Sequence, residues 1–329
     1  MKQHYISRKK QGRGFSYTSN GTRITDKAEL DYIKSLRVPP AWQNVHIAQD
    51  KAAKILATGT DSAGRVQYIY HPDYRAQQEQ AKFERVLRFA RALPRMRRIV
   101  DKDLQRKRLD YRKVMAAIIS IMDQTYIRVG NDAYAREHNS YGLTTLRSKH
   151  TTVEGSTITF DFTGKSGQHH VKRVTDRKLA QIVRQLDELP GYEVFKYYDE
   201  AGNLHDVKST DVNAYIKDSM GEEFSAKDFR TWAGTLIASA ELVVAERAES
   251  ERERKKTITT CVRKVAKRLG NTPAVARSSY IDPRIIKSFM DGNDLAKVRR
   301  TVEKMEDTKG PAYLSPEERC VLHMLEQAK

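Results

Sequence analysis

The chain has 329 residues, of which 39% are hydrophobic, and 60 lysines and arginines outnumber 42 acidic residues to give a formal net charge of +18. This length suits one large domain or two smaller ones, each with its own core. The excess of positive charge predicts a polyanionic partner such as nucleic acid, because phosphates that bind cationic side chains release their condensed counterions. A soluble protein with a merely basic surface is the alternative.

The composition excludes several classes of protein. The two cysteines, Cys261 and Cys320, form no disulfide framework, and neither lies near a CxxC or a histidine cluster that could bind structural zinc. No stretch approaches the roughly 20 apolar residues that span a bilayer. The first residues, "MKQHYISRKKQGRGFSY", lack the apolar run of a signal peptide. We therefore expect a soluble cytoplasmic protein with no membrane partner, no metal and no cofactor.

The chain begins with a polar segment and continues with strands. Residues 1–25 are rich in Gly, Ser, Lys and Arg, and their composition predicts a flexible basic arm. Residues 36–74 contain the turn "TDSAGR" and the β-rich "VQYIYH", which predict strands and turns. The pattern becomes helical near residue 76. We therefore expect a small β-rich domain at residues 26–80 and a larger domain at residues 81–329.

Two helices are predicted at the start of the larger domain. Apolar residues at helical spacing, Phe83, Val86, Leu87 and Ala90, mark the first, and Pro94 is expected to interrupt it. The second, "RKVMAAIISIMDQTYIRVG", is apolar at nearly every central position, which predicts a buried helix that ends near Gly130.

The stretch "TITFDFTGKSGQHHVKRV" predicts a β-hairpin with Lys165 at its tip. Ile158, Phe160 and Phe162 alternate with polar residues, as expected of a strand with one buried face. Two glycines in "TGKSG", Gly164 and Gly167, can supply the positive φ that a hairpin loop needs.

Three further helices carry start signals, which are an acidic residue three positions after a serine cap or a proline in the first turn. The signals are Ser225 with Asp228, Asp282 with Pro283 in a helix that ends at Gly292, and Ser315 with Pro316 and Glu318. The sequence does not reveal the role of residues 293–329, which could form a cap that packs on the larger domain.

One stretch, "RSSYIDPRII", raises the question whether Tyr280 is a packed aromatic residue or a nucleophile. A phenol attacking a phosphodiester needs cations at the nonbridging oxygens and a proton donor for the departing sugar oxygen. Arg128 and Arg230 could supply the cations and Lys165 the proton. Taken singly, each of these residues more often has a structural role. Arg128 could be a helix-end charge, Arg230 a snorkelling side chain and Lys165 a solvated turn residue. Asn271 could be a helix C-cap.

The ordered set of motifs removes this ambiguity. "YIRVGN", "TGKSG", "KDFRTWAGT" and "SYIDPRII" together resemble the type IB DNA topoisomerases in their compact bacterial and poxvirus-like form. The resemblance covers roughly residues 36–290 and includes "VPPAWQNVHIA" and "EHNSYGLTTLRSKH". It implies an α+β fold, in which a small β-rich N-terminal domain and a larger, mainly helical catalytic domain with a β-hairpin clamp duplex DNA.

The resemblance also implies a mechanism. Tyr280 matches the nucleophile, which forms a 3′-phosphotyrosyl link; Arg128 and Arg230 match the arginines that hold the nonbridging oxygens; Lys165 matches the general acid. Supercoiled double-stranded DNA would be relaxed by strand swivelling and religation, without ATP or metal, by a monomer. Asn271 departs from the histidine of poxvirus and eukaryotic relatives. An amide can donate a hydrogen bond but cannot titrate, and the pattern "LGNTP" points to a bacterial source and the nucleoid.

Five further positions match DNA contacts of the family. In the N-terminal domain they are Gln67, Tyr68 and Tyr70, although Tyr68 and Tyr70 could instead form a core aromatic pair. In the catalytic domain they are Tyr134 and Lys227, and Lys227 could equally be a surface lysine.

Two rival functions remain. A tyrosine recombinase shares the catalytic fold, but its second arginine usually lies in an HxxR box, and here that box reads "KDFR". A non-catalytic nucleic-acid binder could use the +18 charge alone. Such a binder predicts that Tyr280→Phe has no measurable effect.

Overall fold

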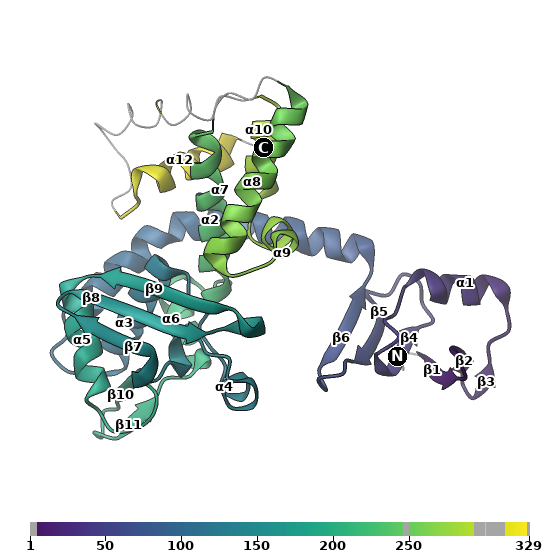
Figure 1. Cartoon of the computed structure of the whole chain (residues 1–329), viewed down its shortest axis with the longest axis horizontal. Helices are drawn as coiled ribbons and strands as arrows, with labels where there is room; N and C mark the ends of the chain where they lie inside the picture. Colours follow the sequence, from purple (N-terminus) through teal and green to yellow (C-terminus); the bar gives the residue numbers. More distant parts are fainter. Residues whose placement is uncertain (1–4, 246–249, 293–299, 301–312, 328–329) are drawn as a thin grey trace. The chain divides into compact units, whose positions relative to one another are not determined.

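The computed structural model describes residues 5–245, 250–292, 300 and 313–327, and the chain divides into two compact units, residues 1–84 and 85–329. The first unit is built mainly of strands and the second mainly of helices (Figure 1). The expected α+β fold class is therefore confirmed. None of the described helices has the length and apolar character needed to cross a membrane.

The N-terminal unit contains a six-stranded antiparallel sheet with the strand order β3-β2-β1-β4-β5-β6. Helix α1 (Lys27–Ser35) connects β3 to β4, and Asp26 caps it by accepting a hydrogen bond of 2.8 Å from the backbone amide of Glu29. The strands are β1 (Tyr5–Gln11), β2 (Gly14–Ser19), β3 (Thr22–Arg23), β4 (Gln43–Ala48), β5 (Ile55–Thr60) and β6 (Val66–Tyr70).

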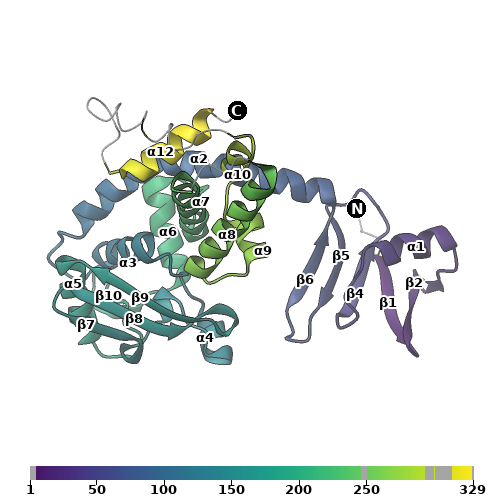
Figure 2. The same cartoon turned by 45° about the horizontal axis from the view of Figure 1, so that its top comes forward.

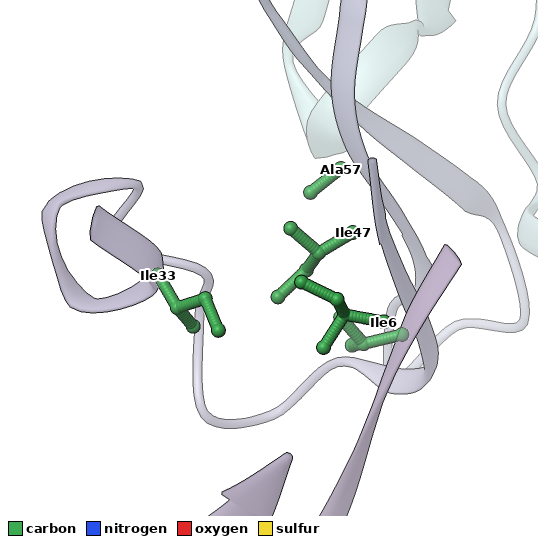
Figure 3. Packing of buried hydrophobic residues seen from close by; sticks show 5 residues of the cluster. Ile6, Ile33, Ile47 and Ala57 are labelled. Carbon is green, nitrogen blue, oxygen red and sulfur yellow. The ribbon is translucent and has the colours of Figure 1, made fainter. Parts of the chain in front are cut away.

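The expected basic arm is wrong for the residues that are described, because residues 5–23 form β1, β2 and β3. Ile6 on β1 lies opposite Ile47 on β4, and it packs with Ile33 of α1 and Ala57 of β5 in the core of this unit, where each is at most 1% exposed (Figure 3). One inward isoleucine in a polar strand is enough to attach it to the sheet, since most of the binding is backbone hydrogen bonding. Composition alone could not reveal this.

Helix α2 (Pro72–Asp103) runs for 32 residues across the boundary between the two units, and Pro94 lies inside it without interrupting it. The expected break is therefore wrong. Proline removes one helical hydrogen bond and costs about 3 kcal/mol in a helix interior. Ala90, Leu93 and Met96 around it are fully buried, so packing within the second unit offsets this cost.

The C-terminal unit combines helices with a three-stranded sheet of order β7-β8-β9, against which α3 and α5 pack (Figure 2). Its strands are β7 (Thr151–Glu154), β8 (Thr157–Thr163), β9 (His169–Thr175), β10 (Lys196–Tyr198) and β11 (Leu204–Asp206). Its helices are α3 (Tyr111–Thr125), α4 (Asp132–His138), α5 (Arg177–Asp187), α6 (Ser209–Met220), α7 (Ala226–Val243), α8 (Glu251–Leu269), α9 (Pro273–Ser279), α10 (Pro283–Met290) and α12 (Pro316–Gln327), with short 3-10 turns at Leu143–Thr145, Ser148–His150 and Lys165–Gly167.

Helix α3 is the predicted buried helix, but it ends at Thr125 rather than near Gly130. Tyr126 adopts a left-handed conformation with a φ of 60°, and its backbone amide donates to the carbonyl of Met122. The chain leaves the helix at this point, so Arg128 lies in a segment outside it.

The predicted β-hairpin is confirmed as β8 and β9, and Ile158, Phe160 and Phe162 are buried on one face of β8. The loop between the strands differs from expectation in one respect. Gly167 has the expected positive φ of 70°, but the second left-handed residue is Ser166, with a φ of 62°. Gly164 is extended, with a φ of −101°.

The three predicted helix starts are confirmed. The Ser225 amide donates to Asp228 at 2.9 Å, Asp282 accepts from the Arg284 amide at 3.0 Å, and Ser315 and Glu318 bond each other's backbone amides at 3.2 Å and 2.9 Å. Helix α10 ends at Met290, just before Gly292.

The described part of the C-terminal segment packs on α7, in line with a cap on the larger domain. Trp232 on α7 donates a hydrogen bond of 3.1 Å to Glu318 on α12, and Glu318 also pairs with Arg97 of α2. The rest of that segment, residues 293–299, 301–312 and 328–329, lies outside the described residues.

Candidate active site

A cavity of about 540 Å³ lies in the C-terminal unit. It is bordered by the segment after α3, by α4, by the tip of the β8–β9 hairpin, by the start of α7 and by the residue that follows α9. Candidates that are far apart in the sequence meet there. They are Arg128, Tyr134, Lys165, Lys227, Arg230 and Tyr280.

Arg128 is half-buried, and its guanidinium group donates hydrogen bonds to the carbonyl of Gly270 at 3.3 Å and to Oδ1 of Asn271 at 2.5 Å. Burial lowers its pKa, and the nearby Tyr280 acts in the opposite direction. A Cβ on Gly142 would lie 2.6 Å from the Arg128 carbonyl oxygen, so the close approach of these two segments requires glycine. The segment that carries Arg128 is therefore fixed from both sides, and the arginine is not simply a charge at a helix end.

Arg230, in the first turns of α7, is 5% exposed. It donates to the carbonyl oxygens of Tyr126 at 2.5 Å and Leu269 at 2.7 Å, and its guanidinium carbon lies 5.1 Å from the centre of the Tyr280 ring. Burial and the adjacent Arg128 lower its pKa to about 10. The group still carries its charge at neutral pH, so Arg230 faces the site and does not snorkel to bulk solvent.

Tyr280 directly follows α9 and is half-buried beside both arginines. Burial raises the pKa of its phenol, but the charges of Arg230, Arg128 and Lys227 outweigh burial, so that the pKa lies below its ordinary value of 10.0. The fold therefore favours the phenolate that an attack would use. Of the two alternatives posed by the sequence, a purely packed aromatic residue does not account for this environment.

The backbone of Tyr280 rests directly on helix α7. A Cβ on Gly234 would lie 2.4 Å from the Tyr280 carbonyl oxygen, and the neighbouring Thr235 donates to that oxygen at 3.4 Å. The Thr235 hydroxyl also accepts from the Asp282 amide at 3.0 Å. Arg230 is on the same helix one turn earlier, so α7 positions the tyrosine and one of its arginines together.

Lys165 is exposed in the loop of the β8–β9 hairpin and lines the same cavity as the two arginines. It also lines a second, very small cavity, together with Arg128, His170 and Arg230. The fold thus brings this lysine to the site, and a solvated turn residue is an incomplete description of it.

Asn271 caps helix α8 through its backbone and contacts Arg128 through its side chain. Its backbone amide donates to the carbonyl of Ala266 at 2.9 Å and so caps α8. Its side-chain oxygen accepts from Arg128, which can only donate, and this fixes the orientation of the amide. The amide nitrogen Nδ2 is buried and has no hydrogen-bond partner within the described residues. A buried donor of this kind is costly unless a ligand satisfies it.

Tyr134 on α4 and Lys227 at the start of α7 are exposed at the rim of the same cavity. Tyr134 is 41% exposed, and the Lys227 charge contributes to lowering the pKa of Tyr280. Lys227 is therefore electrostatically part of the site, although its side chain is also a surface lysine.

The three N-terminal candidates lie on the edge strand β6 of the other unit. Tyr68 and Tyr70 are 47% and 43% exposed, and their rings stack with centroids 5.9 Å apart. The alternative of a core aromatic pair is therefore wrong. Gln67 points to the opposite face of the strand, where its amide donates to Asp61 at 2.9 Å.

The positive charges at the cavity come from side chains. Within the described ranges, no three His, Cys, Asp or Glu residues are grouped in a way that could hold a metal ion. Two guanidinium groups, an ammonium group and a phenol of lowered pKa can together bind a phosphodiester, stabilise extra charge on its oxygens and attack its phosphorus.

Two family profiles match the chain: "Bacterial DNA topoisomerase IB, N-terminal domain" over residues 14–61 and "Eukaryotic DNA topoisomerase I, catalytic core" over residues 71–308. The chain belongs to the type IB DNA topoisomerases. It is thus a DNA topoisomerase, an isomerase, and the rival assignments as a recombinase or a non-catalytic binder are excluded.

Named relatives agree with this family. The chain is 34% identical to DNA topoisomerase 1B of Acanthamoeba polyphaga mimivirus over 285 residues, with 84% of each chain covered. It is 22% identical to DNA topoisomerase 1B of Vaccinia virus (strain Copenhagen), over 84% of this chain and 87% of the viral one. It is 23% identical to DNA topoisomerase 1 of Schizosaccharomyces pombe, over 62% of this chain and 25% of the yeast protein.

Sequence reasoning missed three residues that shape the site. Gly234 and Thr235 hold the tyrosine, and the glycine in "WAGT" was a usable signal, because an isolated glycine in an apolar helix often marks a close approach of another backbone. His170, beside the small cavity, had no comparable signal.

Proposed function

We propose that Tyr280 is the nucleophile of this topoisomerase. Its oxygen attacks a DNA phosphorus, the bond from phosphorus to the 5′ oxygen breaks, and a 3′-phosphotyrosyl link and a free 5′-hydroxyl form. The reverse attack by that hydroxyl religates the strand. The link keeps the energy of the original ester, so neither step needs ATP.

The observation that carries the proposal is the shared cavity in which Arg128, Lys165, Arg230 and Tyr280 meet. Arg128 and Arg230 hold the nonbridging oxygens and stabilise the charge that builds up on them in the transition state. Because both guanidinium groups are anchored by protein acceptors, little reorganisation is needed when the reaction starts.

Two unsatisfied donors support phosphate binding at this position. Nε of Arg230 and Nδ2 of Asn271 are both buried and have no hydrogen-bond partner within the described residues. A phosphoryl group that accepts from them would remove the cost of leaving them unpaired. Asn271 acts in this scheme as a donor and not as an acid.

Lys165 is the general acid. An ammonium group on a flexible stem can follow the departing 5′ oxygen and deliver a proton to it, which a permanently charged guanidinium group cannot do. Its exposure in a hairpin loop is consistent with this task, because the lysine can regain a proton from solvent between steps.

The substrate is supercoiled duplex DNA, held as in a clamp by a monomer, with the downstream duplex free to swivel. Tyr68 and Tyr70 offer exposed aromatic faces, and Tyr134 and Lys227 line the cavity rim. A basic stripe on α8 adds phosphate contacts. Its members lie within an arc of roughly 60° at 100° per residue and are all exposed. They are Arg252, Lys256, Arg263 and Lys267.

We place the enzyme in the bacterial cytoplasm, acting on the nucleoid. The support is Asn271 in place of histidine and the match of residues 14–61 to the bacterial N-terminal domain.

The test is relaxation of a supercoiled plasmid in EDTA without ATP, comparing the natural chain with Tyr280→Phe. The natural chain should relax the plasmid and leave a covalent adduct on Tyr280 when trapped with denaturant. Tyr280→Phe should do neither, while its affinity for duplex DNA stays within about threefold, since the hydroxyl contributes one contact among many. Relaxation by Tyr280→Phe, or an adduct on another residue, would overturn the assignment.

A further inference from the structure

The hairpin that carries Lys165 needs a support, because its loop is exposed and its tip includes two left-handed residues. His170, the second residue of β9, lies at the base of this loop. Its imidazole is half-buried and touches the aromatic ring of Phe162 on the partner strand, with centroids 5.3 Å apart. The ring therefore faces inward at the base of the loop.

His170 fills the space between two glycines from separate segments. A Cβ on Gly164, in the hairpin loop, would lie 2.8 Å from its Cδ2. A Cβ on Gly270, in the turn before Asn271, would lie 2.2 Å from its Cε1. Real Cβ contacts are never this close, so both positions need glycine to leave room for the ring.

The neighbouring strand residue on the same face strengthens this contact. Lys172 donates a hydrogen bond of 2.8 Å to the carbonyl of Arg268, in the last turn of α8. Strand β9 thus rests on the C-terminal end of α8 through two side chains. The hairpin with Lys165 and the turn with Asn271 are connected through them.

We propose that His170 is a positioning residue that holds the Lys165 loop against the Gly270–Asn271 turn, so that the lysine meets the departing 5′ oxygen. It does this as a neutral spacer: burial and the charges of Lys172, Arg128, Arg230 and His169 lower its pKa to about 4. A neutral ring can pack among these cations without repelling them. The inference rests on the proposed role of Lys165 as general acid.

The central experiment compares cleavage of two DNA substrates, one with the ordinary 5′ oxygen and one with a 5′-bridging sulfur that leaves without a proton. His170→Ala should slow cleavage of the ordinary substrate about 10- to 100-fold, because a displacement of about 1 Å at a reacting group has effects of this size. It should slow cleavage of the sulfur substrate less than about threefold. His170→Phe, which keeps a ring of similar size, should be within about threefold of the natural chain on both substrates.

Gly164→Ala is a second test of the positioning role, and it remains informative if the His170→Ala variant folds poorly. Gly164 has an ordinary extended backbone, so alanine is tolerated there except for its contact with the His170 ring. It should show the same selective defect on the oxygen substrate. In the double variant with His170→Ala, the added methyl fits the vacated space, and the defects should be clearly less than multiplicative.

The matched control is His169→Ala. His169 is exposed, pairs with Asp161 at 2.6 Å and lies on the opposite face of the same strand. It should change neither rate by more than about twofold. DNA binding of each variant, measured in the Tyr280→Phe background, reports on folding.

The outcomes distinguish a failure of the His170 positioning role from a failure of the Lys165 general-acid role. Equal defects of His170→Ala on both substrates, or no defect, would overturn the positioning role of His170. If Lys165→Ala itself gains nothing from the sulfur substrate, the general-acid assignment fails first.

Discussion

The cations that line the cavity are held in opposite ways, and we call Arg128 and Arg230 with their anchors the fixed side and the loop with Lys165 the loop side. On one side, Arg128 and Arg230 are anchored by backbone and side-chain acceptors, and Arg230 is 5% exposed. On the other side, Lys165 is exposed on a loop between two strands. In the proposed mechanism, the charges that must be present throughout the reaction are fixed in place, whereas the group that must gain and lose a proton keeps access to solvent. Substitutions on the two sides should therefore fail differently.

The largest effect is expected on the fixed side. Arg230→Ala should slow cleavage by about 10³-fold or more, because it removes a preorganised cation from a site sheltered from water. Arg230→Lys should still be slowed about 10²-fold, since a point charge cannot replace the planar fork. Lysine would also leave the Tyr126 and Leu269 carbonyl oxygens imperfectly paired. Single-turnover cleavage of a duplex measures both variants.

Both Arg230 variants should be equally slow on oxygen and sulfur substrates, because stabilising phosphoryl oxygens does not depend on the leaving group. Arg173→Lys, at an exposed position of β9, is the control and should be unaffected. Near-normal activity of Arg230→Lys would remove this arginine from the site.

The next largest effect is expected on the loop side. Lys165→Ala should slow cleavage of the ordinary phosphodiester about 10²- to 10³-fold, a typical loss for a general acid. The 5′-sulfur substrate should recover most of this loss. Lys165→Arg keeps the charge but gives a much weaker acid, so it should resemble alanine on oxygen and the natural chain on sulfur. If Lys165→Arg cleaves the ordinary substrate normally, the lysine acts through its charge and not its proton.

The sequence predicted which candidates meet at the cavity better than it predicted the residues that support them. The order of motifs selected Tyr280, the two arginines and Lys165, and the structure brings all four to one cavity. Supporting residues such as Gly234 and His170 act by filling or leaving space. Residues of many types can do this in other folds, so their type alone does not reveal the role. For the same reason, composition wrongly predicted a flexible arm at residues 5–23, where one buried isoleucine decides the structure. The expected helix break at Pro94 was also wrong, because packing outweighs a lost hydrogen bond there.

Asn271 belongs to the fixed side and should show a moderate effect. Asn271→Ala should slow cleavage about 10-fold, since it removes the proposed hydrogen bond to the phosphoryl group and one acceptor of Arg128. Asn271→Asp keeps that acceptor but loses the donor and adds a negative charge beside the phosphate, so it should be slower than alanine. Asn271→His keeps a donor and should stay within about fivefold of the natural chain. Single-turnover rates rank the three variants, and an aspartate variant faster than alanine would contradict the donor role.

The smallest expected effect is a dependence of the free energy of unfolding on pH, which arises from His170. The folded chain lowers the pKa of His170 from its ordinary 6.5 to about 4, so between these values the unfolded chain binds a proton that the folded chain excludes. The contribution to the free energy of unfolding is therefore complete above pH 6.5 and is lost as the pH falls toward 4. Because the ring is only half-buried, solvent screening limits the loss to about 1 kcal/mol. Urea unfolding of the full chain at several pH values should show this decrease in the natural protein and not in His170→Phe. A parallel decrease in both would mean that other groups that titrate in this range, and not this imidazole, respond to acid, and the hairpin would then be held by contacts that do not depend on a neutral ring.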